Sequence, residues 1–378
     1  MGYIPKCYAP SVTLNVSGEE KAPRPISAWN ESLGPRDDLI GQPTTTLITS
    51  LLTDGFVASH KPQLFVRPFA PHSQNPAMTR VHDIPSSASL SMDISSSRPR
   101  TPLRLVTFNV RYATTHPEKH EKPWHIRCPK LTNQLIFITA GHESPFICLQ
   151  ECLHQQVQDI QQRLPRGWAH IGRGRGEQEH DGEYSPVFYR SDIWRCERSE
   201  TRWLSKTPHK PSRGWDAVLN RIVTMGQFSH RSTGTRVVVM STHFDHIGVK
   251  AREHSAQLLI KFAREWSSPG DDTAAPSAVL VGGDFNSSPE DAAYKAMTGP
   301  DSGMSDVSDL VPQDLHYGNE TTYTSFGEGW EPSRIDFLFI REPRTAHIRT
   351  FGVLANGFDD DVRVSDHRPV VSDMDIVV

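Results

Sequence analysis

The sequence contains few cysteines and no hydrophobic run that could cross a membrane. Its five cysteines, an odd number among 378 residues, are irregularly spaced, which argues against a disulfide framework and favours a reducing compartment. Apolar stretches such as TTTLITSLLTDGFVA (residues 44–58) are too short and too interrupted to span a bilayer. The first residues also lack the basic and apolar segments of a signal peptide. We therefore expect a cytoplasmic protein, a monomer, with no membrane association.

The chain also lacks an excess of basic residues. It has 40 Lys and Arg against 44 Asp and Glu, and residues 101–378 keep this acidic excess. A tight nucleic-acid binder usually shows a basic footprint, which is missing here. One basic run lies between Arg195 and Arg213. A solvated surface is its simplest interpretation, with a track for a polyanion as the alternative.

The first hundred residues differ from the rest of the chain. Residues 1–100 are rich in Pro, Ser and Thr and show no sustained hydrophobic period, so we expect a disordered N-terminal extension. Residues 101–378 carry regular patterns and are expected to form the folded domain. Within them, the glycine-rich stretch GRGRG (residues 172–176) does not follow the dinucleotide-binding pattern, and we expect a mobile surface loop there.

The patterned region alternates between strand and helix signals. Strands are expected over residues 103–110, 146–151, 168–172, 185–190, 221–230, 235–244, 279–284, 334–340, 347–355 and 368–377. Helices are expected over residues 131–140, 154–164 and 249–266, with another opening at Ser288. Many strands in hairpin pairs with few crossover helices predict an α/β architecture of mixed, mostly antiparallel sheets covered by helices.

The stretch VLVGGDFNSSPED (residues 279–291) has an unusual order of residues. An apolar strand runs directly into Asp284 and Asn286, and the chain then turns into the expected helix. Burying a carboxylate or an amide without partners costs about 2–7 kcal/mol or more. The C-terminal ends of strands are where α/β proteins usually carry their functional sites. We therefore expect these two side chains to belong to a functional site.

Other expected strands finish in similar residues. Each has an ordinary interpretation when taken alone: a turn-forming Asn, a Glu paired with an Arg, or a His in the core. Together they comprise only carboxylates, carboxamides and imidazoles, which a hard divalent metal ion and acid–base chemistry require. The set comprises Asn109, Glu151, His243, Asp245, Asp284, Asn286, Asp336, Asp366 and His367.

Six motifs carry a resemblance to a known family. In chain order they are TFNVRY, LQE, STHFDH, GDFN, RIDFLFI and SDHRPV. This series resembles the endonuclease/exonuclease/phosphatase (deoxyribonuclease I-like) superfamily over roughly residues 103–378. The resemblance implies a four-layered α/β/β/α sandwich, with the active site at one end of two packed sheets.

The resemblance also implies a role for each matching residue. It assigns Mg²⁺, with Mn²⁺ as the alternative, to Asn109, Glu151 and Asp366. It assigns Asp336 and His367 to a carboxylate–imidazole pair that activates water or holds the phosphate. His243 would stabilise the transferring phosphoryl group or protonate the leaving oxygen. The remaining roles are positioning of the nucleophile and a phosphate oxygen by Asp284 and Asn286, and substrate binding by Glu183, Tyr184, Arg221 and Asp245.

Two interpretations of Arg221 stay open: a contact with a phosphate oxygen, or a salt bridge to a neighbouring acid. The leading function is metal-dependent hydrolysis of a phosphodiester, as in a nuclease acting on a nucleic-acid strand. The alternative is a phosphomonoesterase acting on a small sugar, nucleotide or inositol phosphate. A third hypothesis, a non-catalytic scaffold that binds phosphorylated ligands, is disfavoured because the residues implied for catalysis are all present.

Overall fold

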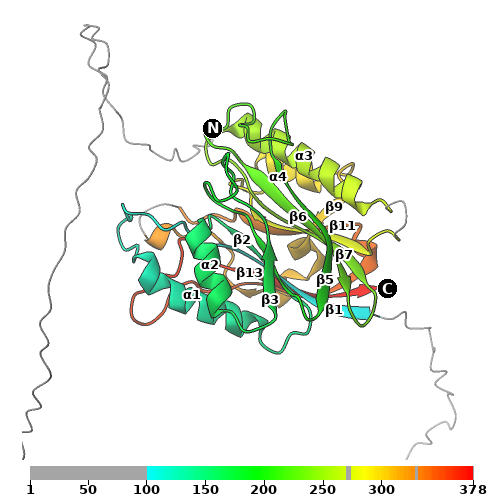
Figure 1. The fold of residues 1–378 in the computed structure, drawn as a ribbon, viewed down its shortest axis with the longest axis horizontal. Coiled ribbons are helices and arrows are strands. Elements are labelled where there is room, and N and C mark those ends of the chain that lie inside the picture. The colour runs from blue at the N-terminus through cyan, green and yellow to red at the C-terminus, as the bar shows by residue number, and fades with distance from the viewer. Residues whose placement is uncertain (1–99, 270–273, 328–330, 378) are drawn as a thin grey trace, which may run out of the picture. The chain divides into compact units, whose positions relative to one another are not determined.

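The computed structural model describes residues 100–269, 274–327 and 331–377. The predicted N-terminal extension lies outside the described residues, apart from Arg100. Within them, 13 strands form two sheets that pack face to face (Figure 1).

The first sheet has seven strands in the order β10-β12-β13-β1-β2-β4-β3. In that order they span Tyr317–Gly318, Ala346–Val353, Val370–Val377, Arg100–Asn109, Pro145–Gln150, Val187–Arg190 and Trp168–Ile171. Strands β1 and β2 run parallel, as do β10 and β12, and the other neighbours are antiparallel. The parallel central pair brings the ends of β1 and β2 to the same edge.

The second sheet has six strands in the order β5-β6-β7-β8-β11-β9. They span Trp194–Trp203, Ile222–His230, Arg236–His243, Ala278–Asp284, Asp336–Arg341 and Met304–Asp306. Only β7 and β8 run parallel among the printed pairs of this sheet. This sheet therefore also has one parallel pair whose carboxyl ends coincide.

Four α-helices cover the outer faces of the sheets (Figure 1). They are α1 (Trp124–Thr139), α2 (His154–Arg163), α3 (Val249–Ser267) and α4 (Ala292–Thr298). Short 3₁₀ turns span Val307–Leu310, Gln313–Leu315, Ser325–Gly327 and Pro343–Thr345.

Three buried clusters hold the layers together. One lies between the sheets and includes Leu105, Phe146 and Leu280. A second joins α3 and α4 to the second sheet, and a third joins α1 and α2 to the first sheet. Apolar residues on both faces of each central strand produce this arrangement, because each strand is buried on both sides. The structure confirms the predicted α/β/β/α sandwich of mixed, mostly antiparallel sheets.

Some element boundaries differ from the sequence-based expectation. Helix α1 begins at Trp124, directly after Pro123, instead of at residue 131. Helix α4 begins at Ala292 and not at Ser288, because the Asp291 carboxylate accepts a hydrogen bond from the Ser288 backbone N–H at 2.9 Å and closes a turn there.

Strand β5 was not predicted, because its basic residues resemble a solvated surface. In the structure, the Arg198 guanidinium lies 4.0 Å from the centre of the Trp266 ring. Arg202 forms ion pairs with Glu200 and Glu265 at 2.8 and 2.7 Å. These two arginines cover helix α3 and are paired within the chain, which weakens the alternative of a polyanion track.

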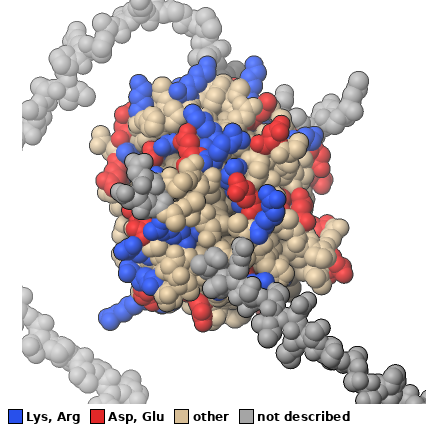
Figure 2. Space-filling view, turned by 90° about the vertical axis from the view of Figure 1, so that its right-hand side faces the viewer, with Lys and Arg blue, Asp and Glu red and all other residues tan. Residues whose placement is uncertain are grey.

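One face of the described chain shows basic and acidic side chains interspersed (Figure 2). On that face they do not form one continuous basic stripe. No described helix is long and apolar enough to cross a membrane.

Two glycines allow the strands to pack closely just before Asp284. A Cβ at Gly282 would lie 3.0 Å from the Cβ atoms of Thr107 and Cys148 in the opposite sheet. A Cβ at Gly283 would lie 2.6 Å from the Thr242 backbone oxygen on the neighbouring strand. Glycine at these positions therefore sets the spacing of the strands that carry the polar residues.

Substitution of Gly283 by alanine should destabilise the fold. The added methyl group meets backbone, which cannot rotate away, so strand β8 must shift, at a cost of about 1–3 kcal/mol in unfolding free energy. Gly357→Ala is the matched control, because its methyl group would meet nothing closer than 3.7 Å. Urea unfolding of both variants tests this, and equal unfolding free energies would contradict it.

Candidate active site

The strands bring their polar residues to one end of the two sheets. Because β1 and β2 run parallel, Asn109 at the end of β1 lies near Glu151, which follows β2. In the second sheet, Asp284 at the end of β8 pairs with His243 of β7 and with Asp336 of β11. The two sheets therefore place both sets of side chains at one edge, where α/β folds carry their sites.

The Asn109 amide links the two sheets. Its Nδ2 donates to Glu151 Oε1 at 3.0 Å and to Asp284 Oδ2 at 2.9 Å. Its Oδ1 accepts from the Arg111 backbone N–H at 2.9 Å. The amide therefore fixes the spacing of two carboxylates from different sheets. To bind a metal ion, Asn109 would have to use its Oδ1. In this structure that oxygen accepts the hydrogen bond from the Arg111 backbone N–H, so the predicted ligand role of Asn109 is not supported.

Glu151 is held in an unusual backbone conformation. Its φ of 61° lies in the left-handed region, which is uncommon for a residue other than glycine and marks strain stored at functional sites. Its Oε2 accepts a hydrogen bond from the Tyr112 backbone N–H at 3.1 Å. Burial alone would raise the pKa of Glu151, but Arg111 and the Asn109 amide outweigh it and lower the pKa. Glu151 therefore carries a negative charge at neutral pH.

Asp336, His367 and Asp284 form a connected buried group. His367 Nδ1 lies 2.8 Å from Asp336 Oδ2, and its Nε2 lies 3.7 Å from Asp284 Oδ2. Burial and the neighbouring Asp336 raise the pKa of Asp284 to about 7. Burial opposes the charge of His367, but Asp336 and Asp284 raise its pKa to about 10. The predicted pair is therefore assembled, with the imidazole protonated at neutral pH.

His243 and Asn286 lie on the other side of Asp284. The Asn286 Nδ2 is 3.0 Å from His243 Nε2 and donates to the Phe244 backbone oxygen at 3.0 Å. Burial and Arg221 lower the pKa of His243 well below its ordinary value. A neutral ring that accepts the Asn286 hydrogen bond at Nε2 carries its proton on Nδ1. His243 Nε2 also lies 3.4 Å from Asp284 Oδ2, so both histidines approach one carboxylate.

Asp366 lies near the first sheet's part of the site. Its Oδ1 accepts a hydrogen bond from Ser365 Oγ at 3.2 Å. Burial and the nearby Glu151 raise the pKa of Asp366, and the positive charge of His367 partly opposes this shift. Arg111 stands by these two acids. Burial disfavours its charge, but Asp366 and Glu151 raise its pKa.

The donor set fits a hard divalent cation. Glu151, His243 and Asp284 present ligand atoms that all lie within 4.8 Å of one another, as do Asp284, Asp336 and His367. Asp366 belongs to neither group. Burial first, and then the neighbouring acids Asp336 and Glu151, raise the pKa values of Asp284 and Asp366, so the described side chains do not fully stabilise these two groups as anions. Carboxylate oxygens are the ligands that Mg²⁺ and Mn²⁺ prefer, so a cation here would relieve that charge.

Arg221 is nearly fully buried and only partly paired. Its Nε lies 3.5 Å from Asp245 Oδ2, and its Nη2 lies 3.0 Å from His246 Nδ1. Its Nε and Nη1 nevertheless have no hydrogen-bond partner among the described residues. Nη1 and His243 Nδ1 approach the same Glu183 oxygen, at 3.9 and 3.8 Å. The salt bridge considered for Arg221 exists, and it leaves donors available beside His243.

The GRGRG stretch is not a free surface loop. Backbone hydrogen bonds from Gly174 to Glu179, from Arg175 to Glu183 and from Gly176 to Asp181, at 2.8 to 3.0 Å, fold it back on itself. The Arg175 guanidinium binds both oxygens of Glu183, at 2.8 and 2.9 Å. The expectation of a mobile loop is therefore replaced by an ordered turn that holds Glu183 beside His243.

Two residues assigned to substrate binding have their polar atoms engaged elsewhere. Asp245 accepts four backbone hydrogen bonds, from Val218, Leu219, Ile247 and Gly248, at 2.8 to 3.3 Å. The Tyr184 hydroxyl contacts His154 Nδ1 and His180 Nδ1 at 3.1 and 2.8 Å, and its ring lies in the core beneath α2. Asp245 positions the loop before Arg221, and Tyr184 anchors the loop that carries Glu183.

Sequence reasoning missed three residues near the site: Arg111, Arg175 and His246. Arg111 is two positions after Asn109, inside the motif TFNVRY, and His246 directly follows Asp245. For Arg111 and His246, closeness in the sequence to an expected site residue was the one indication that they belong to the site. Arg175 had no such signal, because it reaches Glu183 only through the folding of the GRGRG turn.

The geometry agrees with comparisons to known proteins. The Endonuclease/Exonuclease/phosphatase family matches residues 106–367. The chain belongs to this family. A solved family protein from Bacteroides thetaiotaomicron is 29% identical, with a TM-score of 0.65 over 74% of this chain and 100% of that one. No curated protein matches the chain.

Further family structures differ in what their names say they act on. A mannosyl-6-phosphatase from Bacteroides thetaiotaomicron is 30% identical, with a TM-score of 0.63 over 72% of this chain and 99% of that one. TDP2 from D. rerio, solved with a single-strand DNA product, is 17% identical, with a TM-score of 0.54 over 72% and 99% of the two chains. The second likeness shows the fold alone. Family membership supports a phosphohydrolase and leaves its substrate open.

The His367–Asp336 pair should make stability depend on alkaline pH. The pKa of His367 rises from 6.5 to about 10 on folding, so its stabilisation is complete below pH 6.5 and is lost as the pH rises through 10. We expect the unfolding free energy to fall by on the order of a few kcal/mol across this window. Denaturant titrations at several pH values measure it.

Asp336→Asn is the matched variant for this test. It keeps a hydrogen-bond acceptor at His367 and removes the negative charge that contributes most to raising the pKa. The decline in stability between pH 6.5 and 10 should become shallower. Identical slopes in the two proteins would show that Asp336 does not hold the imidazole charged.

Proposed function

We propose that this protein is a divalent-metal-dependent phosphomonoesterase that acts on a small, sugar-like phosphorylated metabolite. The observation that supports phosphate binding at this site is the buried Arg221 side chain, 4% exposed, whose Nε and Nη1 have no hydrogen-bond partner in the described part of the chain. Leaving buried donors unsatisfied is costly, and Arg matches the geometry of phosphate oxygens. A phosphate beside His243 would satisfy these donors.

Two further observations favour a small monoester over a nucleic-acid strand. The relative at 30% identity is named a mannosyl-6-phosphatase. Two arginines of β5 that could track a polyanion are engaged within the chain: Arg202 pairs with Glu200 and Glu265, and Arg198 packs on Trp266. The phosphodiester hypothesis rests on motifs that both kinds of enzyme share, so it becomes the second candidate.

The geometry supports a division of roles among the residues of this chain. Asp284 is the carboxylate that both histidines approach, so it can position an attacking water and accept its proton. The protonated His367, oriented by Asp336, provides positive charge against the developing charge on the phosphoryl oxygens. Asn286 holds His243 so that its Nδ1–H is available to the phosphate or to the leaving oxygen.

The metal site adds charge neutralisation to this arrangement. Glu151 would be the principal ligand, with Asp284 in reach and Asp366 and Asn109 beside it. A bound divalent cation supplies Lewis-acid stabilisation of phosphoryl oxygens. Arg111 would balance the acids that remain around it.

Hydrolysis of model substrates tests the proposal. We expect p-nitrophenyl phosphate to be cleaved faster than bis-(p-nitrophenyl) phosphate with Mg²⁺ or Mn²⁺, and EDTA to abolish both reactions. Asp284→Asn and His367→Ala should each lower kcat by about 10²–10⁴-fold, the range for acid–base groups. Glu151→Gln, nearly isosteric, should raise the metal concentration needed for half-maximal rate.

Other results would redirect the assignment. Preference for the diester, lost in the same variants, would favour the nuclease-like candidate. Absence of hydrolysis of either compound, together with tight binding of inorganic phosphate, would favour the scaffold hypothesis. Gly357→Ala is the control for preparation and folding, because the added methyl group would make only an ordinary van der Waals contact, outside the site.

A further inference from the structure

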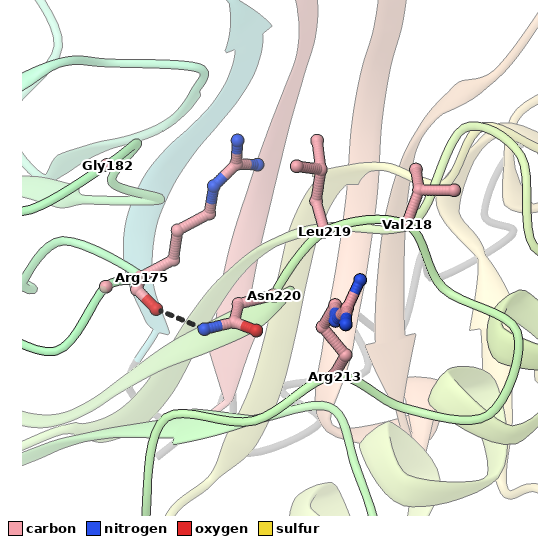
Figure 3. Close-up of a pocket in the computed structure, with 7 residues that line it drawn as sticks. Arg175, Gly182, Arg213, Val218, Leu219 and Asn220 are labelled. Carbon is pink, nitrogen blue, oxygen red and sulfur yellow. Dashed lines mark hydrogen bonds between the residues drawn. The ribbon is translucent and has the colours of Figure 1, made fainter. Parts of the chain in front are cut away.

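A groove of about 270 Å³ (Figure 3) includes Arg175, which binds Glu183 of the candidate active site. It is lined by Arg175, Gly176, Gly182, Arg213, Val218, Leu219 and Asn220. The roles proposed above do not use Arg213, Val218 or Asn220. The groove therefore offers space and side chains that those roles leave unassigned.

Shared residues connect the groove to the site. Arg175 lines the groove and binds Glu183, which lies 3.8 Å from His243 Nδ1. Asn220 directly precedes Arg221 in the chain, and its Nδ2 donates to the Arg175 backbone oxygen at 3.2 Å. Arg175 and Asn220 therefore link the groove to Glu183 and Arg221 of the candidate site.

Arg213 supplies unbalanced positive charge in this groove. Arg175 is neutralised by its two-pronged contact with Glu183. Arg213 is exposed and makes no ion pair or hydrogen bond with any residue in the described part of the chain. In Figure 3, Asn220 lies between Arg175 and Arg213. Among the described residues that line the groove, Arg213 therefore offers a cation that no other described side chain pairs with.

The other lining groups suit a polyol. Asn220 Oδ1 accepts no hydrogen bond from the described residues, so it is available to a substrate hydroxyl. Val218 is 40% exposed and offers an aliphatic surface to the carbon side of a sugar. An acceptor, an aliphatic wall and a cation in one groove match a hydroxylated carbon chain that ends in an anion.

We propose that this groove binds the non-reacting end of the substrate, and that Arg213 selects substrates carrying a second anionic group, a carboxylate or a second phosphate. This rests on the proposed phosphomonoesterase function and narrows its substrate class. Arg213 is a specificity-determining residue in this account. It takes no part in the hydrolysis itself.

Steady-state kinetics with three probes test the proposal. Glucose 6-phosphate has no second anionic group, 6-phosphogluconate carries a carboxylate, and glucose 1,6-bisphosphate carries a second phosphate. For Arg213→Gln, we expect KM to rise roughly tenfold for at least one of the two probes that carry a second anionic group, as for the loss of one charged hydrogen bond. We expect kcat to stay nearly unchanged. KM for glucose 6-phosphate should change less than about twofold. The probe with the larger effect identifies the anionic group.

Two controls separate a local effect from a change in net charge or folding. Arg344→Gln removes the same charge from an exposed arginine on the turn Pro343–Thr345, away from the groove lining, and should leave every KM unchanged. Arg213→Lys should recover part of the affinity lost in Arg213→Gln. Thermal unfolding of each variant verifies that the fold is intact.

The outcomes distinguish failure of the inference from failure of the proposed function. If the wild type hydrolyses the probes and Arg213→Gln changes all three KM values equally or not at all, the groove proposal is overturned and the phosphomonoesterase stands. If the wild type hydrolyses none of the probes with Mg²⁺ or Mn²⁺, both proposals fall.

Discussion

The whole site depends on one amide that joins the two sheets. Asn109 ends a strand of the first sheet and donates to Glu151 on its own side and to Asp284 on the other. These two bonds fix the separation of carboxylates that the sandwich brings together from distant parts of the chain. The glycines before Asp284 allow the close packing that this bridge requires, since any side chain there would push the sheets or strands apart.

Close packing of acids is the electrostatic consequence of this bridge. Glu151 keeps a lowered pKa because Arg111 and Asn109 stabilise its anion, whereas burial raises the pKa of Asp284 and Asp366. The same environment divides the histidines: His367 is held charged by Asp336, and His243 is held neutral by burial and Arg221. Environments that shift the pKa values of neighbouring titratable groups in opposite directions are typical of acid–base sites.

The sequence was most informative about strand tips. Periodicity located β1, β2, β7 and β8, and a polar residue directly after a buried strand identified Asn109, Glu151, His243 and Asp284 because their burial needs a reason. Strand β5 escaped prediction because its arginines pack on Trp266 and pair with Glu265 through tertiary contacts, which local pattern does not encode.

The remaining part of the site could not be derived from local sequence. Arg175 reaches Glu183 only because the GRGRG turn folds onto residues 179–183. The motif comparison identified Asp245 and Tyr184, but their polar atoms serve backbone amides and two histidines instead of an open cleft. The hydrogen-bond partner of a polar side chain depends on tertiary packing between residues far apart in the sequence. A short motif does not contain that information.

The central claim is that the bridged carboxylates form one divalent-cation site. Calorimetric titration with Mn²⁺ at neutral pH, in two buffers of different ionisation enthalpy, tests it most directly. We predict one ion bound per chain, with release of protons from Asp284, whose pKa is raised to about 7, and much weaker binding in Glu151→Gln. Equal binding by the wild type and Glu151→Gln, or binding without proton release, would contradict this account.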